Sequence, residues 1–291
     1  MRESPRTILR RIPGVRAAHR ELARARCGLA VPDELSLLIR DDRAVVLHPL
    51  LGIETDRVAR SCVGRDVARD LIDVHGTART PRKLIHGHAV PEGAALLRQP
   101  LALLKLPSAH EEYLKLVGSK CRNRIRKAER EGYKFKEFIW NDHLGDICEV
   151  NQSKECRQGG PMHGWYARPV EPRYCTENEE CYRKYYGLFR DGKLRAYCHV
   201  VLCGDFAFFR HCIGHARDLP CGVMNGLLSG MVHEYAGSPE ILWFSYGTLH
   251  ASCAPLESFA KHVGCEPFAV VLDLANDDEL QEYARRRRWQ P

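Results

Sequence analysis

The stretch Ser119-Lys-Cys-Arg-Asn-Arg-Ile-Arg-Lys-Ala-Glu-Arg-Glu-Gly132 combines an apolar stripe with a dense set of basic residues. Apolar residues recur at three- and four-residue spacing here and in the run-in from His110: Leu114, Val117, Cys121, Ile125 and Ala128. This spacing predicts one face of a helix. The other faces are basic, because residues 115–136 contain nine Lys or Arg and two Glu, a local charge of +7 that equals the net charge of the whole chain.

The composition indicates a soluble globular protein. The chain has 291 residues, of which 44% are hydrophobic and 28% charged, and it contains no apolar run near twenty residues, so we expect no membrane span. Two further basic clusters lie at residues 1–26, with eight Arg and two Glu, and at Arg285–Arg288. Three such clusters favour an anionic partner such as RNA, a phosphorylated carrier or a membrane surface. Solvated tails and surface helices are the alternative explanation.

The cysteines predict neither disulfides nor a zinc site. The chain has 13 Cys but no Cys-x-x-Cys spacing, so we expect no structural metal. It also lacks the apolar core of a secretory signal peptide, and its Arg-rich start has few of the hydroxyl residues of a transit peptide. We therefore expect a cytoplasmic protein whose cysteines are mostly buried thiols, with a basic helix over residues 15–27.

The order of predicted elements divides the chain into two domains. Residues 1–98 predict a small αβ unit with a hairpin over 36–48 and a helix over 55–75. Residues 99–291 form the second domain, with a capping box between Ser108 and Glu111 and a basic C-terminal tail. After the basic helix we expect strand 133–140, helix 144–157, loop 158–166, helix 177–186, strands 186–190, 193–202 and 206–214, helix 224–235, strand 241–246, helix 254–262 and strand 267–274.

The pattern Ser-Lys-x-Arg-x-x-Ile-Arg-Lys-Ala-x-Arg-x-Gly, followed by a strand, resembles the entry to the acyltransferase domain of the FemAB-like branch of the GNAT superfamily. The resemblance covers roughly residues 105–275. It implies an α+β GNAT fold with a mixed central sheet, preceded by a small αβ unit in place of a first GNAT-like half. It also implies transfer of an amino acid from aminoacyl-tRNA to an amine of a peptide, cell-wall precursor or small metabolite, without a cofactor.

The identity of the acyl donor depends on the loop after strand 206–214. GNAT enzymes that use acetyl-CoA hold its pyrophosphate on main-chain N–H groups of a glycine-rich loop at a helix N-terminus. Here residues 215–223 contain one glycine, Gly222, and Pro220 lacks an N–H group. The loop therefore argues against CoA. Two alternatives stay open: a GNAT N-acyltransferase that uses acyl-CoA or acyl carrier protein, and a non-catalytic GNAT-like module that binds RNA.

The basic helix supplies the predicted contacts to tRNA phosphates. These are Lys120, Arg122, Arg124, Arg126, Lys127 and Arg130. Arg122, Arg126 and Arg130 follow one another at four-residue steps, so they form one stripe along the helix. A solvated basic helix is again the alternative.

The candidate catalytic residues come from three segments. Loop 158–166 is rich in glycine and aromatic residues, so we expect Trp165 and Tyr166 to line a substrate pocket and His163, in preference to His211 or His215, to transfer a proton. Tyr246 ends a strand where GNAT clefts open, as a general acid or an aromatic wall. Residues 258–264 resemble a FemAB-like Phe-Lys-x-x-Phe-Gly segment, which implies that Lys261 contacts the acyl carbonyl or a phosphate.

Overall fold

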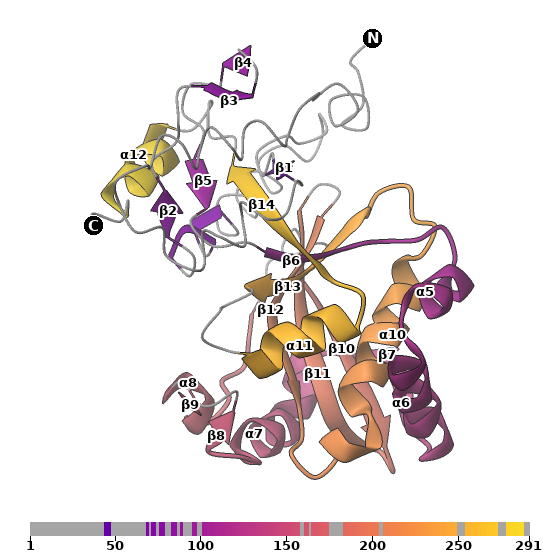
Figure 1. The fold of residues 1–291 in the computed structure, drawn as a ribbon. Coiled ribbons are helices and arrows are strands. Elements are labelled where there is room, and N and C mark those ends of the chain that lie inside the picture. Colours follow the sequence, from indigo (N-terminus) through magenta and orange to yellow (C-terminus); the bar gives the residue numbers. More distant parts are fainter. Residues whose placement is uncertain are drawn as a thin grey trace. The chain divides into compact units, whose positions relative to one another are not determined.

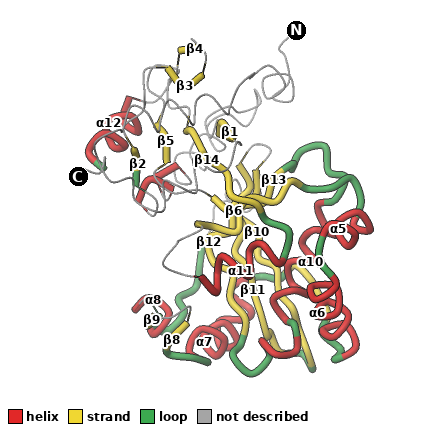
Figure 2. Tube along the Cα trace, viewed as in Figure 1, coloured by secondary structure: helices red, strands yellow, loops and turns green. Residues whose placement is uncertain are grey.

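The computed structural model describes two units of the chain (Figures 1 and 2). The described residues are 44–47, 68–69, 71–73, 76–78, 83–85, 88–89, 95–97, 101–157, 160–162, 164–174, 183–203, 206–248, 254–272 and 278–287. Unit 1 comprises Met1–Ala102, Thr248–Ala251 and Glu266–Pro291, and unit 2 comprises Leu103–Gly247 and Ser252–Cys265. The sequence-based division had kept all of residues 99–291 in the second domain, including the C-terminal segment that here groups with unit 1.

Unit 2 is built on a mixed sheet. Its strands are β6 (Leu101–Lys105), β7 (Lys134–Glu137), β10 (Arg183–Arg190), β11 (Lys193–Cys203), β12 (Phe206–Gly214) and β13 (Trp243–Thr248), in the order β6-β13-β12-β11-β10-β7. The strands β7, β10, β11 and β12 pair antiparallel, whereas β12 and β13 are parallel. With helices on both faces, this is the α+β architecture with a mixed central sheet that the sequence predicts.

The β10–β11–β12 meander confirms the predicted strand pattern. Asp191 and Gly192 connect β10 to β11 with φ angles of 51° and 76°, the left-handed conformation that a tight hairpin turn requires. The predicted helix over residues 177–186 is wrong at its end, because Arg183–Tyr186 already belong to β10. Its earlier residues lie outside the described part of the chain.

The basic stretch forms two helices instead of one. Helix α5 (His110–Leu116) ends at Val117, and α6 (Ser119–Arg130) begins after Gly118, because both linking residues have extended backbone. The apolar stripe nevertheless faces inward in both helices, with Val117, Cys121 and Ile125 buried. The predicted cap at the start of α5 also changes partner: the Ser108 hydroxyl donates to Glu112 Oε2 at 2.8 Å, not to Glu111.

The remaining helices of unit 2 include the three predicted ones, of which the helix predicted over 144–157 ends at Gln152, because Cys156 and Arg157 belong to a strand. These helices are the 3₁₀ turn η1 (Trp140–His143), α7 (Leu144–Gln152), the short α8 (Gly164–Ala167), the 3₁₀ turn η2 (Leu219–Cys221), α10 (Val223–Tyr235) and α11 (Ala254–His262). Between α7 and α8, β8 (Cys156–Arg157) pairs with β9 (Gly160–Pro161). The turn α8 falls within the segment that the sequence predicts to be a loop, so Trp165 and Tyr166 lie on a helical turn.

Helix α10 packs on α6 through a row of glycines. A Cβ atom at Gly222 would lie 2.3 Å from the Arg124 carbonyl oxygen, one at Gly226 would lie 3.1 Å from the Ala128 Cβ atom, and one at Gly230 would lie 2.4 Å from the Phe135 ring. The first two glycines thus bring the α10 backbone against α6, and the third brings it against the strand that follows α6.

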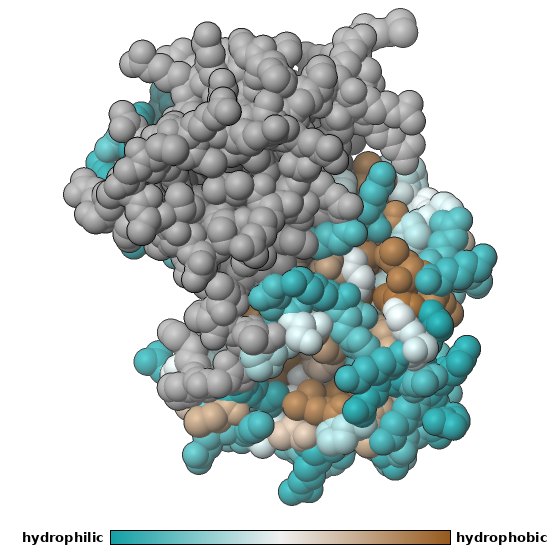
Figure 3. All heavy atoms as spheres, viewed as in Figure 1, coloured by the Kyte–Doolittle hydropathy of each residue, from teal (hydrophilic) through white to brown (hydrophobic). Residues whose placement is uncertain are grey.

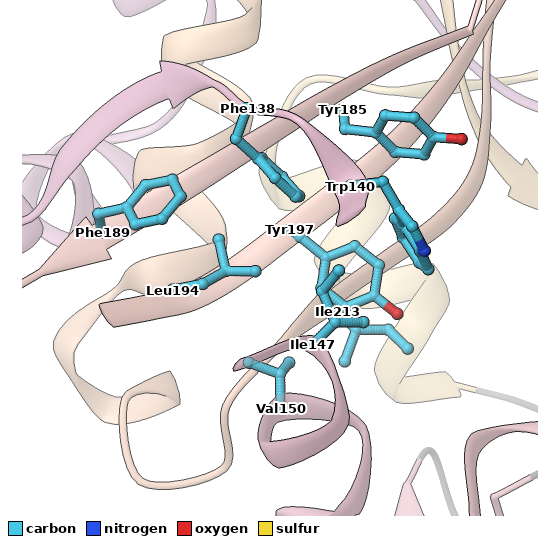
Figure 4. Close-up of a cluster of buried hydrophobic side chains, with 9 residues drawn as sticks. All are labelled: Phe138, Trp140, Ile147, Val150, Tyr185, Phe189, Leu194, Tyr197 and Ile213. Carbon is cyan, nitrogen blue, oxygen red and sulfur yellow. The ribbon is translucent and has the colours of Figure 1, made fainter. Parts of the chain in front are cut away.

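Helix α7 covers the opposite face of the sheet. In β10, Leu188 lies against Gly226 of α10, whereas the next residue, Phe189, lies in a cluster with Ile147 and Val150 of α7. Successive strand residues point to opposite faces, so α10 and α7 are on different sides. Figure 4 shows this cluster, in which rings from η1, β10 and β11 surround the aliphatic side chains of α7.

Unit 1 contains a smaller sheet. Strand β14 (Glu266–Leu272) pairs parallel with β1 (Ala44–Leu47) and antiparallel with β5 (Ala95–Leu97), which pairs with β2 (Thr77–Ala78). Strands β3 (Lys83–Ile85) and β4 (His88–Ala89) pair separately. Of the predicted hairpin over 36–48, only 44–47 lie in the described residues. The predicted helix over 15–27 falls outside them, as does most of the one over 55–75.

The predicted basic tail contains a helix, α12 (Asp278–Arg286), with Leu280 and Ala284 buried. Arg285 and Arg286 both pair with Glu282 on this helix. The buried Thr77 hydroxyl donates to the Ala284 carbonyl oxygen at 2.8 Å. Apolar burial on one side of α12 therefore orders a segment whose composition suggested only a solvated end.

Gly222→Ala should destabilise the protein more than Gly192→Ala. Both glycines have positive φ angles, 83° and 76°, so alanine costs about 1–2 kcal/mol at either position. A Cβ atom would meet nothing within 4 Å at Gly192 but would clash with α6 at Gly222, which adds about 1–3 kcal/mol. Urea denaturation of the two variants measures the difference, and equal losses would contradict the close packing of α6 and α10.

Candidate functional site

Helix α6 presents a basic surface, defined by the six predicted phosphate contacts. Lys120, Arg126 and Arg130 are exposed, while Arg122, Arg124 and Lys127 are half-buried. In the view of Figure 3, hydrophilic residues gather over the lower right of unit 2, where Figure 1 shows α6. The exposed members are therefore available to an anionic partner.

The half-buried members of this surface bind main-chain carbonyls of unit 2. The Arg122 guanidinium donates to the carbonyl oxygens of Leu114, at 3.1 Å, and Val117, at the end of α5. Arg124 and Lys127 both donate to the carbonyl oxygen of Pro220, the Lys127 contact being 3.1 Å long. These three cations hold α5, α6 and the turn before α10 together, a role that the stripe pattern of the sequence does not reveal.

Strands β12 and β13 pair with each other over only a short part of β12. Phe206, Ala207 and Phe208 lie opposite Trp243, Phe244 and Ser245, whereas β12 continues to Gly214. Tyr246 follows the paired segment of β13, and its ring lies 5.6 Å from that of Phe259 on α11. The side chain is partly buried, and burial raises the pKa of its hydroxyl.

Of the other two predicted catalytic residues, the structure describes only Lys261. Lys261 is on α11 with its side chain 54% exposed, and its Nζ atom pairs with Glu257 Oε1 one turn away at 2.5 Å. His163 lies outside the described residues. The predictions for all three residues therefore remain predictions.

Trp165 and Tyr166 contact His211, which stacks on His199, and His199 in turn accepts from Arg173. We term these five residues the histidine cluster: Trp165, Tyr166, Arg173, His199 and His211. The Tyr166 hydroxyl lies 3.0 Å from His211 Nδ1, and the Trp165 ring stacks on the His211 ring with centroids 4.6 Å apart. The His199 and His211 rings are stacked at 5.9 Å. Residues from α8, β11 and β12 are thereby brought to one place.

Arg173 joins the histidine cluster to the aromatic core. One guanidinium nitrogen donates to His199 Nδ1 at 3.0 Å and to the Tyr185 hydroxyl at 3.3 Å. The guanidinium also lies over the Trp140 ring, 4.0 Å from its centroid, which is a favourable cation–π geometry. Arg173 therefore fixes His199 and packs on the cluster of Figure 4.

Burial and positive charge keep both histidines of the cluster neutral. Burial, followed by the charges of Arg173 and Arg210, lowers the pKa of His211 to about 4. Burial and the same arginines also lower the pKa of His199 well below its ordinary value. Burial raises the pKa of Tyr166 to about 12. At neutral pH the cluster thus holds uncharged imidazoles beside a protonated phenol.

A neutral His211 can orient the Tyr166 hydroxyl in either of two ways. If His211 carries its proton on Nδ1, it donates to the phenol oxygen, and the Tyr166 O–H group is free to donate to a substrate oxygen. With the proton on Nε2, Nδ1 accepts from the phenol instead. The first arrangement provides a positioned hydrogen-bond donor in a largely buried environment, which is what a developing oxyanion requires.

Sequence reasoning set His211 aside and did not consider His199 or Arg173. If the pairing that begins with Cys203 opposite Phe206 continued regularly, His199 would lie opposite Arg210. Instead, a bulge next to His199 puts His199 opposite His211, while Val200 lies opposite Phe209. The signal in the sequence was that His199 and His211 lie on either side of the predicted Gly204-Asp205 turn. The bulge that places them opposite each other cannot be read from the sequence.

Two further features bear on the site. Among the described residues, no three His, Cys, Asp or Glu side chains are placed to hold a metal ion together. Within the same residues, no helix has both the length and the apolar character needed to cross a bilayer.

Three solved structures show a distant likeness to this chain. FemX matches with a TM-score of 0.48 and 9% identity over 74% of this chain and 68% of its own. The C-terminal domain of a putative lysylphosphatidylglycerol synthetase from Agrobacterium fabrum matches with a TM-score of 0.39 and 15% identity over 64% of this chain and 62% of its own. L-PGS from Bacillus licheniformis matches with a TM-score of 0.40 and 12% identity over 66% of this chain and 65% of its own.

The chain thus spans less than two thirds of the length of two of these three structures. No protein-family model matches its sequence, and no curated protein matches it either. At these identities and TM-scores the likeness assigns no activity. The fold rests instead on the strand order and register of the chain itself.

His211→Gln should reduce the loss of stability at acid pH. The unfolded chain binds a proton at His211 near pH 6.5, while the native state does so only near pH 4. Unfolding therefore takes up a proton between these values, and the free energy of unfolding falls as the pH falls, by at most about 1.4 kcal/mol per pH unit. Urea denaturation at pH 7, 5.5 and 4.5 measures this, and an equally steep fall in the variant would contradict it.

Proposed function

We propose that this protein is an acyltransferase that moves an amino acid from aminoacyl-tRNA to an amine acceptor. The observation that carries the proposal is the basic surface of α6, whose exposed members Lys120, Arg126 and Arg130 belong to the same unit as the mixed sheet. A row of exposed cations binds nucleic-acid phosphates with little dependence on sequence. Because charged tRNA is made in the cytoplasm, we place the protein there.

The turn before α10 favours tRNA over CoA as the donor. A pyrophosphate cradle needs free main-chain N–H groups that the ligand can approach. Here Pro220 has no N–H group, its carbonyl oxygen already accepts from Arg124 and Lys127, and Gly222 lies against the α6 backbone. The turn is therefore occupied by contacts within the protein where CoA phosphates would have to bind.

Aminoacyl transfer needs a nucleophilic amine and a donor for the oxyanion. The amine nitrogen attacks the ester carbonyl carbon, the C–O bond to the terminal ribose breaks, and the proton lost by the amine goes to the ribose oxygen. The product is an amide plus uncharged tRNA. We assign Tyr166, positioned by His211 at 3.0 Å, as the donor to the tetrahedral oxygen.

The three residues proposed from the sequence keep their roles as hypotheses. His163 is two residues from Trp165 in the sequence and is the candidate to take the amine proton. Tyr246, beyond the paired part of β13, is the candidate general acid or aromatic wall. Lys261 would contact the acyl carbonyl or a phosphate only if it released Glu257.

Replacing Lys120, Arg126 and Arg130 together by Glu should abolish binding of tRNA at moderate salt. Each phosphate contact contributes roughly 0.7–0.9 to the slope of log affinity against log salt, so any residual binding should have a slope lower by about two to three. Filter retention of labelled aminoacyl-tRNA across salt concentrations measures both effects. The matched control changes the exposed Lys154, Arg168 and Arg217 to Glu and should leave binding nearly unchanged.

The same assay separates the alternative functions. Retention of one charged tRNA above its uncharged form supports the proposal and identifies the amino acid. Equal retention of charged and uncharged tRNA would favour an RNA-binding module without catalysis. Saturable binding of acetyl-CoA, with no retention of tRNA, would identify an ordinary N-acyltransferase and overturn the proposal.

Tyr166→Phe should lower the rate of transfer but not the affinity for tRNA. The variant keeps the ring that packs on Trp165 and removes only the hydroxyl near His211. Loss of one donor to an oxyanion typically lowers kcat by about 100-fold. Single-turnover transfer from labelled aminoacyl-tRNA measures the rate, and an unchanged rate would remove Tyr166 from the mechanism.

A further inference from the structure

His199 carries a buried hydrogen-bond donor that has no partner among the described residues. Its side chain is 1% exposed, and the Nε2 atom makes no hydrogen bond in the part of the chain that the structure describes. Nδ1 accepts from Arg173, because a guanidinium group only donates, so a neutral His199 has its proton on Nε2. A buried donor without an acceptor costs about 1–3 kcal/mol, and such a group in a native protein calls for an explanation.

Arg173 adds a cation that no acidic side chain of the described residues neutralises. No carboxylate of the described residues lies within ion-pair distance of its guanidinium, which donates through one of its two terminal nitrogens to His199 and Tyr185. The remaining guanidinium nitrogens donate to no described residue. Arg173 is half-buried, so it is reached from solvent while His199 lies beneath it. The two residues together form a set of donors that lacks acceptors.

The surroundings of this pair are positive and aromatic. After burial, the groups that lower the pKa of His199 are Arg173, His211, Arg210 and Arg183, in that order. The Trp140 and Tyr185 rings lie under the Arg173 guanidinium, which fixes its plane and leaves one edge without a partner among the described residues. A planar edge with parallel N–H groups matches a carboxylate, which accepts two hydrogen bonds side by side.

We propose that Arg173 and His199 form a binding site for a carboxylate of the amine acceptor. The Arg173 edge binds the carboxylate oxygens, and His199 Nε2–H, which points away from the hydrogen bond between Nδ1 and Arg173, donates to a second oxygen of the same ligand, such as a peptide carbonyl oxygen. The acceptor is thereby an amino acid or short peptide with a free carboxylate. The identification of this amino acid or peptide as the acceptor of the reaction rests on the proposed function. The proposal that Arg173 and His199 bind a carboxylate does not.

A dense polyanion fits this site less well than a carboxylate. The pair offers one half-buried guanidinium and one buried imidazole, and a dianionic phosphate would need more charge to offset its desolvation. The exposed cations of α6, by contrast, are suited to phosphates of a large ligand. The two donor sets therefore separate the acceptor from the tRNA.

The test titrates the full chain with alanyl-alanine and with its C-terminal amide, following tryptophan fluorescence, since Trp140 contacts Arg173. We expect a saturable response to the dipeptide and a response at least tenfold weaker to the amide and to inorganic phosphate. Arg173→Gln should weaken dipeptide binding at least tenfold. Arg217→Gln, at an exposed arginine outside the cluster, should not change it.

His199→Phe separates ligand binding from a structural role. Phenylalanine keeps a ring beside Tyr185 and removes the unpaired donor, so the melting temperature of the free protein should not fall, while dipeptide affinity should fall. A lower melting temperature with unchanged affinity would show that His199 only supports the fold, and would overturn the proposal. Equal binding of dipeptide and amide, or a response to phosphate alone, would also overturn it.

Transfer assays keep this inference distinct from the proposed function. Dipeptide binding without transfer from any aminoacyl-tRNA would leave the carboxylate site standing and remove the proposed reaction. Transfer that proceeds equally well to the dipeptide and to its amide would support the reaction and remove the carboxylate site from it.

Discussion

The close approach of α10 to α6 is the constraint on which unit 2 depends. Gly222 and Gly226 face α6 at four-residue spacing, and Gly230 faces the strand that follows it, so the two helices meet through backbone instead of long side chains. The buried Asn225 amide also donates to Cys121 Sγ, at 3.4 Å. Any side chain at these glycines would push α10 away from α6 and from the sheet face that both helices cover.

This contact divides the cations of α6 into two groups. Arg124 and Lys127 lie beside the turn that leads into α10, so their charges are held by the Pro220 carbonyl. Residues on the outer side of the helix, such as Arg126 and Arg130, remain exposed. The same packing therefore occupies the turn with hydrogen bonds inside the protein and leaves a basic surface outside, and both features support the proposal of a tRNA donor.

The opposite face of the sheet carries different chemistry. Its core is aromatic (Figure 4), and the histidine cluster extends that core with two neutral imidazoles and the Arg173 cation. An apolar setting strengthens each hydrogen bond it contains and raises the cost of each one left unmade. The His199 Nε2 donor, which has no acceptor among the described residues, is consequently unfavourable for stability, and the proposed ligand would remove this cost.

The sequence by itself determined the local elements. The β10–β11–β12 meander and the inward stripe of α6 follow from two- and 3.6-residue periodicity, which depends on neighbouring residues only. The sequence did not determine the break at Gly118 or the bulge that puts His199 opposite His211. Nor did it determine the main-chain partners of Arg122 and Arg124 within the protein. Those depend on which distant segments meet, because a cation binds a carbonyl or stays in water according to what packs beside it, and only the tertiary structure decides that.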